Sequence, residues 1–372
     1  MYHSLCDTDV FVAGGGPAGL AAAIAARQAG FTVTLADAAH PPIDKTCGEG
    51  IMPDGLAALH ALGITLPPDK TFPFAGIRFS DDTHAVSARF PQGHGLGIRR
   101  TRLHQVLVNH ASDLGVTMHW GARVTGVYEE GVLVNARRIR CRWLVGADGQ
   151  NSRVRYWSGL ENSSNKKRRF GFRRHYRIQP WSEFVEVYWT DRGQVYVTPV
   201  AEDEVCVALI TNMQGVRLDD ALGAFPPLAK NLSGASIITR EQGAITQTYS
   251  LHSVCRKSRA LLGEASGCVD AITGDGLSMA FQQAQALAAA MARSDLGLYR
   301  SAHRRIFRLP RMMAELMLLM DGSAWFRRRA LRALAAEPAL FSRMLAIHTG
   351  ALSPMKFGVQ GTLALGWHLI TA

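Results

Sequence analysis

The chain has 372 residues, 47% of them hydrophobic, and its 41 lysines and arginines exceed its 30 acidic residues, giving a formal net charge of +11. This composition is that of a globular protein with one large or two smaller cores, and the positive charge suits an anionic cofactor, an anionic membrane or nucleic acid without choosing between them. The six cysteines stand singly with no C-x-x-C pair, which argues against a zinc site and against a disulfide framework.

The N-terminus lacks the features of a targeting segment. Residues 1–10 contain neither a basic region nor an apolar one, so no signal peptide is predicted. The sequence has no uninterrupted run of about 20 apolar residues, so we expect no membrane-spanning helix. These features favour a cytoplasmic protein with reduced cysteines.

A glycine-rich turn opens the chain's first predicted helix. Residues 9–13 form a short apolar run typical of a buried parallel strand, and residues 17–29 predict an Ala-rich helix. Between them Gly14, Gly16 and Gly19 fit the pattern G-x-G-x-x-G. The first glycine permits the tight turn, the second lets the backbone approach a pyrophosphate, and the third lets the helix pack closely on the strand.

An acidic residue completes a dinucleotide-binding pattern. Residues 31–36 predict a second strand, and Asp37 follows at the position that binds ribose hydroxyls. Pro17 and Ala18 lie in the first turn of the helix, whose free N–H groups and positive partial charge suit a pyrophosphate. Taken alone, this βαβ unit predicts binding of the ADP half of either NAD or FAD.

The remaining segments alternate between helical and strand patterns. Helices are predicted at residues 53–62, 101–114 and 274–291, and from residue 301 to the end. Strands are predicted at residues 74–80, 85–90, 116–120, within 124–141, and at 142–147, 184–189, 195–199, 205–210 and 260–262. Residues 158–169 are polar and basic and are typical of a linker.

Two later turns decide between NAD and FAD. Asp148 and Gly149 lie in the run GADGQNSRVR directly after a predicted buried strand. Glu264 lies in a second acidic turn, GEA, which is followed by DAITGDGL and a Gly-rich helix start. At these turns and at the first glycine-rich turn, the chain resembles the family of FAD-dependent aromatic hydroxylases and geranylgeranyl reductases, with a p-hydroxybenzoate hydroxylase-like fold.

The resemblance covers most of the chain and implies roles for these residues. Asp148 and Gly149 would lie near the pyrophosphate and a nicotinamide path, and Glu264 would meet the ribityl chain. The isoalloxazine would be cradled by the turn formed by Gly274, Asp275, Gly276 and Leu277. N–H groups at this helix start would stabilise negative charge on reduced flavin. The chain has Glu264 and Ala271 where the family usually has Asp and Pro.

Three further segments match the same family. Arg100, in the pattern R-x-x-L, is implied to lie against FAD, although a solvated helix start explains it equally well. Lys45, Cys47 and Gly48 resemble the K-x-C-G segment that runs beside the flavin in the reductase branch, and Cys47 would face the flavin, the substrate or simply a tight loop. Together with the later Tyr196, Cys47 is the candidate for a catalytic side chain.

A strand near residue 196 resembles the one that lines the substrate cavity of the reductase branch. Tyr196 and Pro199 remain from that branch's Y-x-W-x-F-P pattern, whereas Val197 and Thr198 replace the usual aromatic residues. Tyr188 is expected on a neighbouring strand. Ordinary strand packing is the alternative, because aromatic residues favour sheets. His175 lies among arginines and is interpreted as a surface residue.

Basic clusters at residues 166–169, 304–311 and 327–332 have no recognised nucleic-acid module around them, so nucleic-acid binding is not expected. The last two clusters lie on helices rich in Met, Leu and Phe. Such helices fit peripheral contact with an anionic membrane, the wall of a cavity for an apolar ligand, or a core with a solvated basic face.

The sequence therefore predicts an α/β (α+β) fold. A discontinuous Rossmann-type FAD-binding domain would comprise residues 1–157 and 258–295, a β-rich substrate domain residues 158–257, and a helical region residues 296–372. FAD would be bound non-covalently, with NAD(P)H as electron donor. We expect a monooxygenase that hydroxylates a hydrophobic aromatic or polyketide-like metabolite. Reduction of prenyl double bonds, halogenation and a non-catalytic flavoprotein role are the alternatives, although the tryptophan-rich halogenase segment is missing.

Overall fold

The computed structural model describes residues 6–163 and 167–353. One half of the molecule is built on a sheet with the strand order β18-β19-β11-β1-β2-β8. The central strand, β1, pairs in parallel with β2 and with β11, and its residues Val10, Phe11 and Val12 are fully buried. A strand covered on both faces needs a continuous apolar run, which is the pattern of this segment. The strands of this sheet are β1 (Thr8–Ala13), β2 (Val33–Asp37), β8 (Thr117–Trp120), β9 (Val124–Tyr128), β10 (Gly131–Val134), β11 (Arg137–Gly146), β18 (Cys255–Arg256) and β19 (Arg259–Leu261).

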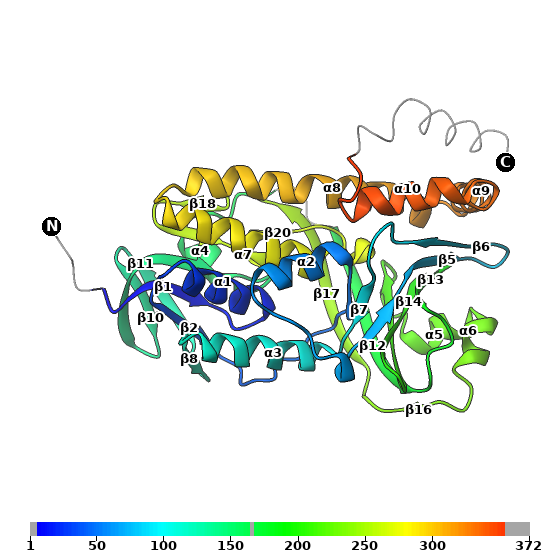
Figure 1. The fold of residues 1–372 in the computed structure, drawn as a ribbon, viewed down its shortest axis with the longest axis horizontal. Coiled ribbons are helices and arrows are strands. Elements are labelled where there is room, and N and C mark those ends of the chain that lie inside the picture. The colour runs from blue at the N-terminus through cyan, green and yellow to red at the C-terminus, as the bar shows by residue number, and fades with distance from the viewer. Residues whose placement is uncertain (1–5, 164–166, 354–372) are drawn as a thin grey trace.

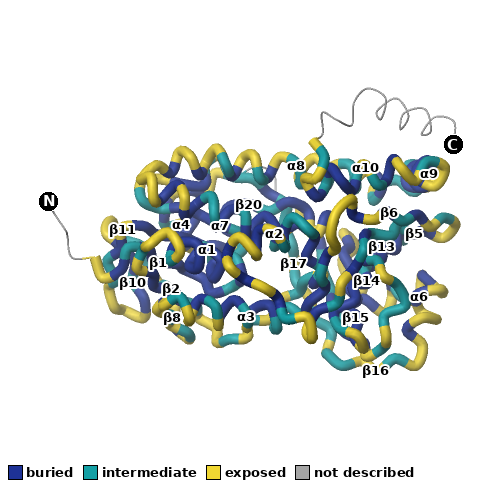
Figure 2. Tube along the Cα trace, viewed as in Figure 1, coloured by how far each residue is buried: buried dark blue, intermediate teal, exposed yellow. Residues whose placement is uncertain are grey.

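Helices cover the parallel sheet and form the largest core cluster. Helix α1 packs against both α7 and α3, so segments that are far apart in the sequence lie side by side. Figure 2 shows that α1 and α7 are buried over most of their length. The helices of this half are α1 (Pro17–Gln28), α2 (Pro53–Ala61), α3 (Arg100–Asp113), α4 (Arg153–Trp157) and α7 (Gly276–Ala292).

A second, mainly antiparallel sheet forms the other half of the molecule (Figure 1). Its order is β20-β17-β12-β15-β14-β13-β5-β6, and β5 pairs in parallel with β13. Its strands are β5 (Gly76–Ser80), β6 (Ala85–Arg89), β12 (Lys167–Arg177), β13 (Phe184–Thr190), β14 (Gly193–Ala201), β15 (Glu204–Thr211), β16 (Ser236–Ile237), β17 (Gln242–Ser250) and β20 (Gly267–Cys268), and the short helices α5 (Leu218–Gly223) and α6 (Pro226–Asn231) pack beside it.

A small sheet and a set of C-terminal helices complete the described chain. The small sheet has the order β3-β7-β4 and contains β3 (Gly50–Ile51), β7 (Gly95–Gly97) and β4 (Phe72–Phe74). The C-terminal helices are α8 (Leu296–Gly322), α9 (Ala324–Ala336) and α10 (Pro338–His348). Figure 1 shows α8 running from the parallel-sheet half toward the antiparallel half, where α9 and α10 follow it.

The α/β class with a Rossmann-type unit and an antiparallel sheet is confirmed, and most predicted elements lie within two residues of their observed bounds. The linker predicted at residues 158–169 is wrong at its C-terminal end, because β12 begins at Lys167. Residues 164–166, and the predicted helical continuation after residue 353, lie outside the described part of the chain. The division into three domains remains a prediction.

Candidate functional site

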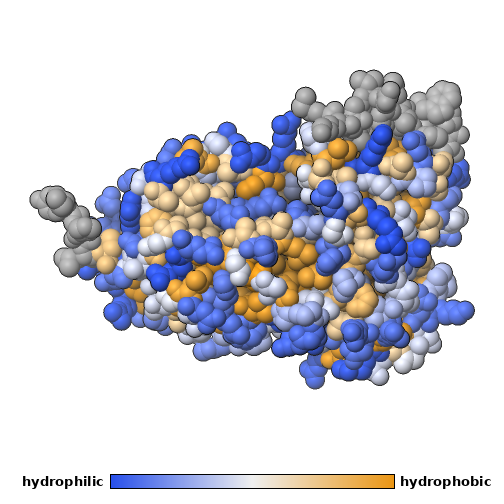
Figure 3. All heavy atoms as spheres, in the orientation of Figure 1, coloured by the Kyte–Doolittle hydropathy of each residue, from blue (hydrophilic) through white to orange (hydrophobic). Residues whose placement is uncertain are grey.

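A cavity of about 740 Å³ lies between the two halves of the molecule. Nearly all residues predicted to contact the cofactor border it: Gly14, Gly16, Pro17, Ala18, Asp37, Lys45, Cys47, Gly48, Arg100, Asp148, Gly149, Glu264, Gly274, Asp275, Gly276 and Leu277. Figure 3 shows apolar surface gathered near the middle of one face, with polar and charged surface around it. The fold thus brings three distant stretches of sequence to one site.

The glycine-rich turn has the geometry that its pattern requires. Gly14 has a φ of 110°, and a Cβ at Gly19 would lie 1.8 Å from the carbonyl oxygen of Gly14. Gly19 lies in α1 on the side that packs against Gly14, and it does not border the cavity. A Cβ at Gly16, in contrast, would meet no atom within 4 Å. Gly16 therefore borders open space where a pyrophosphate could approach the backbone.

Asp37 is fixed at the end of β2 by two backbone donors. The amide of Gly15 donates to Asp37 Oδ2 at 2.6 Å, and the amide of Ala39 donates to Oδ1 at 2.8 Å. These bonds hold the carboxylate beside the glycine-rich turn. Its place at the cavity edge fits the ribose-binding role expected of it.

Asp148 organises the turn that follows β11. Its carboxylate accepts hydrogen bonds from Ser152 Oγ at 2.5 Å and from the amides of Arg153 and Val154 at 2.8 and 3.1 Å. It therefore caps the first turn of α4. Gly149 has a φ of 80° and open space where a side chain would lie. A carboxylate that caps a helix and a glycine that leaves room together shape this edge of the cavity.

The turn before α7 is open toward the cavity. Gly274 has a φ of 73°, and a Cβ at Gly274 or at Gly276 would meet no atom within 4 Å. The first amides of α7 have no partners within the helix, so this end carries positive partial charge. The turn offers backbone donors and space on the same side, as a flavin ring requires.

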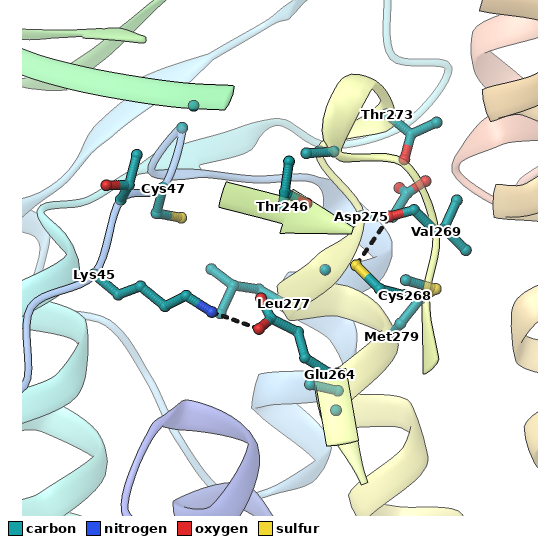
Figure 4. Close-up of a pocket in the computed structure, with 18 of the residues that line it drawn as sticks. Lys45, Cys47, Thr246, Glu264, Cys268, Val269, Thr273, Asp275, Leu277 and Met279 are labelled. Carbon is teal, nitrogen blue, oxygen red and sulfur yellow. Dashed lines mark hydrogen bonds and ion pairs between the residues drawn. The ribbon is translucent and has the colours of Figure 1, made fainter. Parts of the chain in front are cut away.

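Lys45 and Glu264 face one another across the cavity. Figure 4 shows the Lys45 side chain extending toward Glu264, and its Nζ lies 2.5 Å from Glu264 Oε2. Both side chains are more than a third exposed, so the pair contributes little to stability. Cys47 lies on the same loop as Lys45, and its Sγ accepts a hydrogen bond from the amide of Glu49 at 3.4 Å.

A buried ionic network holds the loop that carries Lys45 and Cys47. Glu49 is 2% exposed and accepts hydrogen bonds from Arg173 Nη1 at 2.9 Å and from the amide of Arg100 at 2.8 Å. His175 Nε2 lies 2.7 Å from the other oxygen of Glu49, and His175 is 0% exposed. The interpretation of His175 as a surface residue is therefore wrong. The ligand atoms of Glu49, His175 and Cys206 lie within 4.8 Å of one another, but the carboxylate is already bonded to these donors.

A second buried network lies beside the turn before α7. Arg169 on β12 pairs with Asp270 at 3.1 Å and with Asp321, near the end of α8, at 3.0 Å. Arg169 and Asp270 are each 4% exposed. Tyr196 donates from its hydroxyl to the carbonyl of Ile272 at 2.9 Å. This network connects the antiparallel sheet, the turn and the C-terminal helices.

Beyond this turn the cavity continues into an apolar chamber. We define the apolar chamber as the part of the cavity lined by Ile77, Phe79, Val187, Phe307, Met317 and Phe341. Strands β5 and β13 provide one wall, and helices α8 and α10 provide another. Flexible methionine side chains adapt to irregular apolar ligands, so this lining suits a lipophilic molecule.

The predicted substrate residues have different environments. Tyr196 borders the cavity. Tyr188 belongs to the core cluster on the other face of β13, where its hydroxyl donates to Glu186 at 2.6 Å and its ring packs against Phe225. Pro199 lies next to the lining residue Thr198 and is not among the lining residues itself. The fold brings Tyr196 to the cavity and leaves Tyr188 and Pro199 outside it.

Some charged residues at or beside the cavity could not be predicted from the sequence. Asp54, Arg169 and His348 gain their partners only through contacts between segments far apart in the chain. Only a weak sequence pattern indicates the apolar chamber. The Met- and Leu-rich segment after residue 301 is compatible with a cavity wall, among other interpretations.

The chain is similar in sequence to known FAD-binding proteins. Residues 7–215 match the family model described as an FAD binding domain. The chain is 26% identical to a menaquinone reductase of Mycobacterium tuberculosis, over 77% of each chain. It is 28% identical to a putative FAD-dependent monooxygenase of Bacillus subtilis, over 60% of this chain and 65% of the other.

A solved flavoprotein/dehydrogenase from Cytophaga hutchinsonii has the same fold. The TM-score is 0.80 at 16% identity, covering 98% of this chain and 100% of the other. Among the described residues, no helix combines the length and apolar character that crossing a bilayer demands.

Proposed function

Because the chain belongs to the FAD binding domain family and is an FAD-dependent oxidoreductase, we propose that it is a monooxygenase that hydroxylates a lipophilic aromatic substrate held in the apolar chamber. The observation that carries this proposal is the continuity of the chamber with the cavity bordered by the glycine-rich turns. A single cavity with a polar end and an apolar end suits a dinucleotide cofactor next to an apolar substrate.

The residues present fit FAD. Gly16, Gly149, Gly274 and Gly276 leave space along the cavity where any side chain would intrude. We assign the pyrophosphate to the first turn of α1, the ribose to Asp37 and the ribityl chain to Glu264. The isoalloxazine would lie at the start of α7. When bound, FAD supplies electron transfer and the activation of O₂.

The protein's own contribution is positioning and exclusion of water. The side chains of the apolar chamber would hold an aromatic ring beside the turn before α7 and keep bulk water from it. The Glu49 network would hold the loop with Lys45 and Cys47 against the cofactor, because Glu49 is bonded to the buried Arg173 and His175 of β12. NAD(P)H is the proposed source of electrons.

A reductase function is the second candidate. The Mycobacterium tuberculosis relative is named a menaquinone reductase and matches over more of this chain than the monooxygenase does. The apolar chamber would also accept a prenyl chain. Flavin can deliver hydride to a double bond without O₂, so the two candidates differ in their need for oxygen.

We further propose peripheral contact with an anionic membrane surface. Met312, Leu319 and Trp325 on α8 and α9 are 45%, 57% and 64% exposed, and arginines lie among them in the sequence. Exposed apolar side chains beside arginines favour the boundary of an anionic bilayer. Contact there would bring a lipophilic substrate close to helices that line the apolar chamber.

One experiment separates the candidates. The purified protein is examined for its flavin spectrum, and NADH and NADPH oxidation is followed with and without O₂ on phenolic, polyketide and prenyl substrates. Hydroxylation predicts a product that gains one oxygen atom, and only when O₂ is present. Saturation of a double bond under anaerobic conditions would replace the monooxygenase proposal with the reductase. A protein that neither retains nor rebinds FAD would refute both.

A further inference from the structure

The floor of the apolar chamber contains a row of side chains that crosses three neighbouring strands. Val187 on β13 pairs with Tyr196 on β14 and with Phe79 on β5, and all three residues border the cavity. The Tyr196 hydroxyl donates to the carbonyl of Ile272, so this end of the row lies at the turn before α7. Because neighbouring strands lie about 4.8 Å apart, Phe79 lies about 10 Å along the floor from Tyr196.

Helix α10, on the opposite wall, gives a second measure of the same length. Phe341 and His348 both border the cavity, and they lie on one face of the helix because they are two turns apart. His348 Nε2 lies 3.3 Å from Asp275 Oδ1, so the C-terminal end of α10 also lies at the turn before α7. Two helical turns span about 10 Å. Both walls therefore place Phe79 and Phe341 at a similar distance from the turn.

Phe79 and Phe341 are in contact across the chamber. Their ring centroids lie 4.9 Å apart, and the ring planes are inclined by 33°. Trp189 supports this pair from the side, because its ring meets the ring of Phe79 edge to face at a centroid distance of 5.8 Å and is almost completely buried. Such aromatic contacts stabilise the rings in place. We call the two phenylalanines the Phe79–Phe341 pair.

The cavity does not continue past this pair on the sheet. The next position in the row is Val86 on β6, which pairs with Phe79, is buried and does not border the cavity. Ala88 on β6 has the same environment beside the lining residue Ile77. Helices α9 and α10 pack on β6 and cover this edge of the sheet (Figure 1). The pair therefore separates the chamber from a filled core.

We propose that the Phe79–Phe341 pair is the end stop of the apolar chamber and determines which substrates fit. It admits a compact aromatic molecule whose apolar part extends no further than about 10 Å from the turn before α7. A prenyl chain would be accepted only to the same length, and a long polyprenyl chain would be excluded. This inference rests on the proposed function and deepens it by setting the size of the substrate.

The length limit belongs to the two rings because the other walls adapt more easily. Met317 and Met344 border the chamber, and methionine side chains change conformation to fit a ligand. The two rings are held by one another and by Trp189. A longer substrate would have to push them into the core around β6, and overpacking a filled core costs more free energy than one further buried methylene returns.

The test measures how affinity depends on chain length. Binding of a series of 4-alkylphenols, from 4-ethylphenol to 4-octylphenol, to the FAD-loaded protein is measured by calorimetry. Each methylene buried in the chamber should raise the affinity about fourfold. Once the chain reaches the pair, a further methylene should give no gain, so the series should show a break in the wild type.

Variants connect this break to the two rings. Phe341→Ala and Phe79→Ala should each move the break to longer chains by about two methylenes or more, because each leaves a cavity behind the stop. Phe341→Leu keeps the test available if the alanine variants do not fold, and it should move the break by about one methylene. Val187→Phe should move the break to shorter chains, because its ring would fill the middle of the floor.

Phe225→Ala is the matched control. Phe225 is also a buried phenylalanine in an aromatic pair, but it packs against Tyr188 on the other face of the sheet and does not border the cavity. Its loss should lower stability and leave the break at the wild-type chain length. A break that moved as far in Phe225→Ala as in Phe341→Ala would show a general loosening of the protein and would overturn the end stop.

The outcomes separate this inference from the proposed function. A constant gain per methylene through 4-octylphenol in the wild type, or a break that stays in place in the Phe341 and Phe79 variants, would overturn the end stop, whatever product is formed. A break that moves with the two rings supports the end stop even if no bound phenol is hydroxylated, and in that case only the proposed reaction fails.

Discussion

At the scale of single residues, Gly16 and Gly19 give opposite expectations for the same substitution. A Cβ at Gly16 would enter the cavity, whereas one at Gly19 would collide with the backbone of Gly14. Gly16→Ala should leave the stability of the apoprotein unchanged and weaken FAD binding by about tenfold or more, about 1.4 kcal/mol. Gly19→Ala should lower the unfolding free energy by about 2 kcal/mol.

Flavin fluorescence titration and urea unfolding of the apoprotein measure these two effects separately. If Gly16→Ala bound FAD as tightly as the wild type, the assignment of the pyrophosphate to the first turn of α1 would be wrong. Comparable destabilisation by both variants would show instead that Gly16 is needed for packing.

Glu49 illustrates how much a single buried charge can matter. Glu49→Gln removes the charge opposite Arg173 and leaves that buried guanidinium with weaker partners. Loss of one member of a buried ion pair costs about 3 kcal/mol or more. Asp203→Asn is the control, since Asp203 pairs with Arg177 and both side chains are more than 60% exposed; its effect should stay below about 1 kcal/mol. Equal unfolding midpoints for the two variants would contradict a structural role for the Glu49 network.

At the scale of elements, the buried histidine of α8, His303, should make the stability of the protein depend on pH. Burial, and after it the charge of Arg311, lowers the pKa of His303 to about 4, and its ring stacks on Phe307. The unfolded histidine titrates near its ordinary value of about 6.5. Between these values the unfolded state binds more protons than the folded state, so stability falls as the pH drops from about 6.5 to about 4.

His303→Gln should remove this component of the acid sensitivity. The loss of unfolding free energy between about pH 7.5 and about pH 4.5 should be about 2 kcal/mol smaller in the variant than in the wild type. Denaturant unfolding at the two pH values measures it. An unchanged difference would mean that the pKa of His303 is the same in the folded and the unfolded protein.

The comparison of β1 with β12 shows what the sequence can predict at this scale. The strand β1, its turn and α1 are specified by local pattern, because apolar runs and glycines act over a few residues. The start of β12 is predicted as a linker because its first three residues, Lys167, Arg168 and Arg169, are polar and basic. Arg169 and Arg173 are buried there only because Asp270 and Glu49, about 100 residues away or more, supply the opposite charges.

The same limit applies to the site. The residues around the cofactor can be predicted from the sequence because each of them belongs to a short local motif. The ion pair between Asp275, directly before α7, and His348, the last residue of α10, belongs to no local motif. Periodicity and spacing cannot reveal a contact that only the tertiary fold creates.

At the scale of the whole molecule, the exposed apolar residues of α8 and α9 predict binding to anionic vesicles. The protein should sediment with vesicles containing phosphatidylglycerol and much less with pure phosphatidylcholine, and salt should weaken the binding. Replacing both Leu319 and Trp325 by Ala should reduce the bound fraction about fivefold. Tyr156→Ala, which removes another side chain that is 69% exposed, is the control and should bind like the wild type. Equal binding to both lipid compositions would contradict the electrostatic component.

The packing of α1 against α7 has a consequence for how the protein is made in the cell. The first turn for the cofactor is synthesised near residue 16, but the last one, before α7, follows about 260 residues later. During translation the early βαβ unit is therefore made before the helix that buries one of its faces, and the apolar surface of α1 stays exposed in that interval. Cofactor capture should accordingly be a late event in biogenesis, limited by the release of α7 from the ribosome rather than by the supply of FAD.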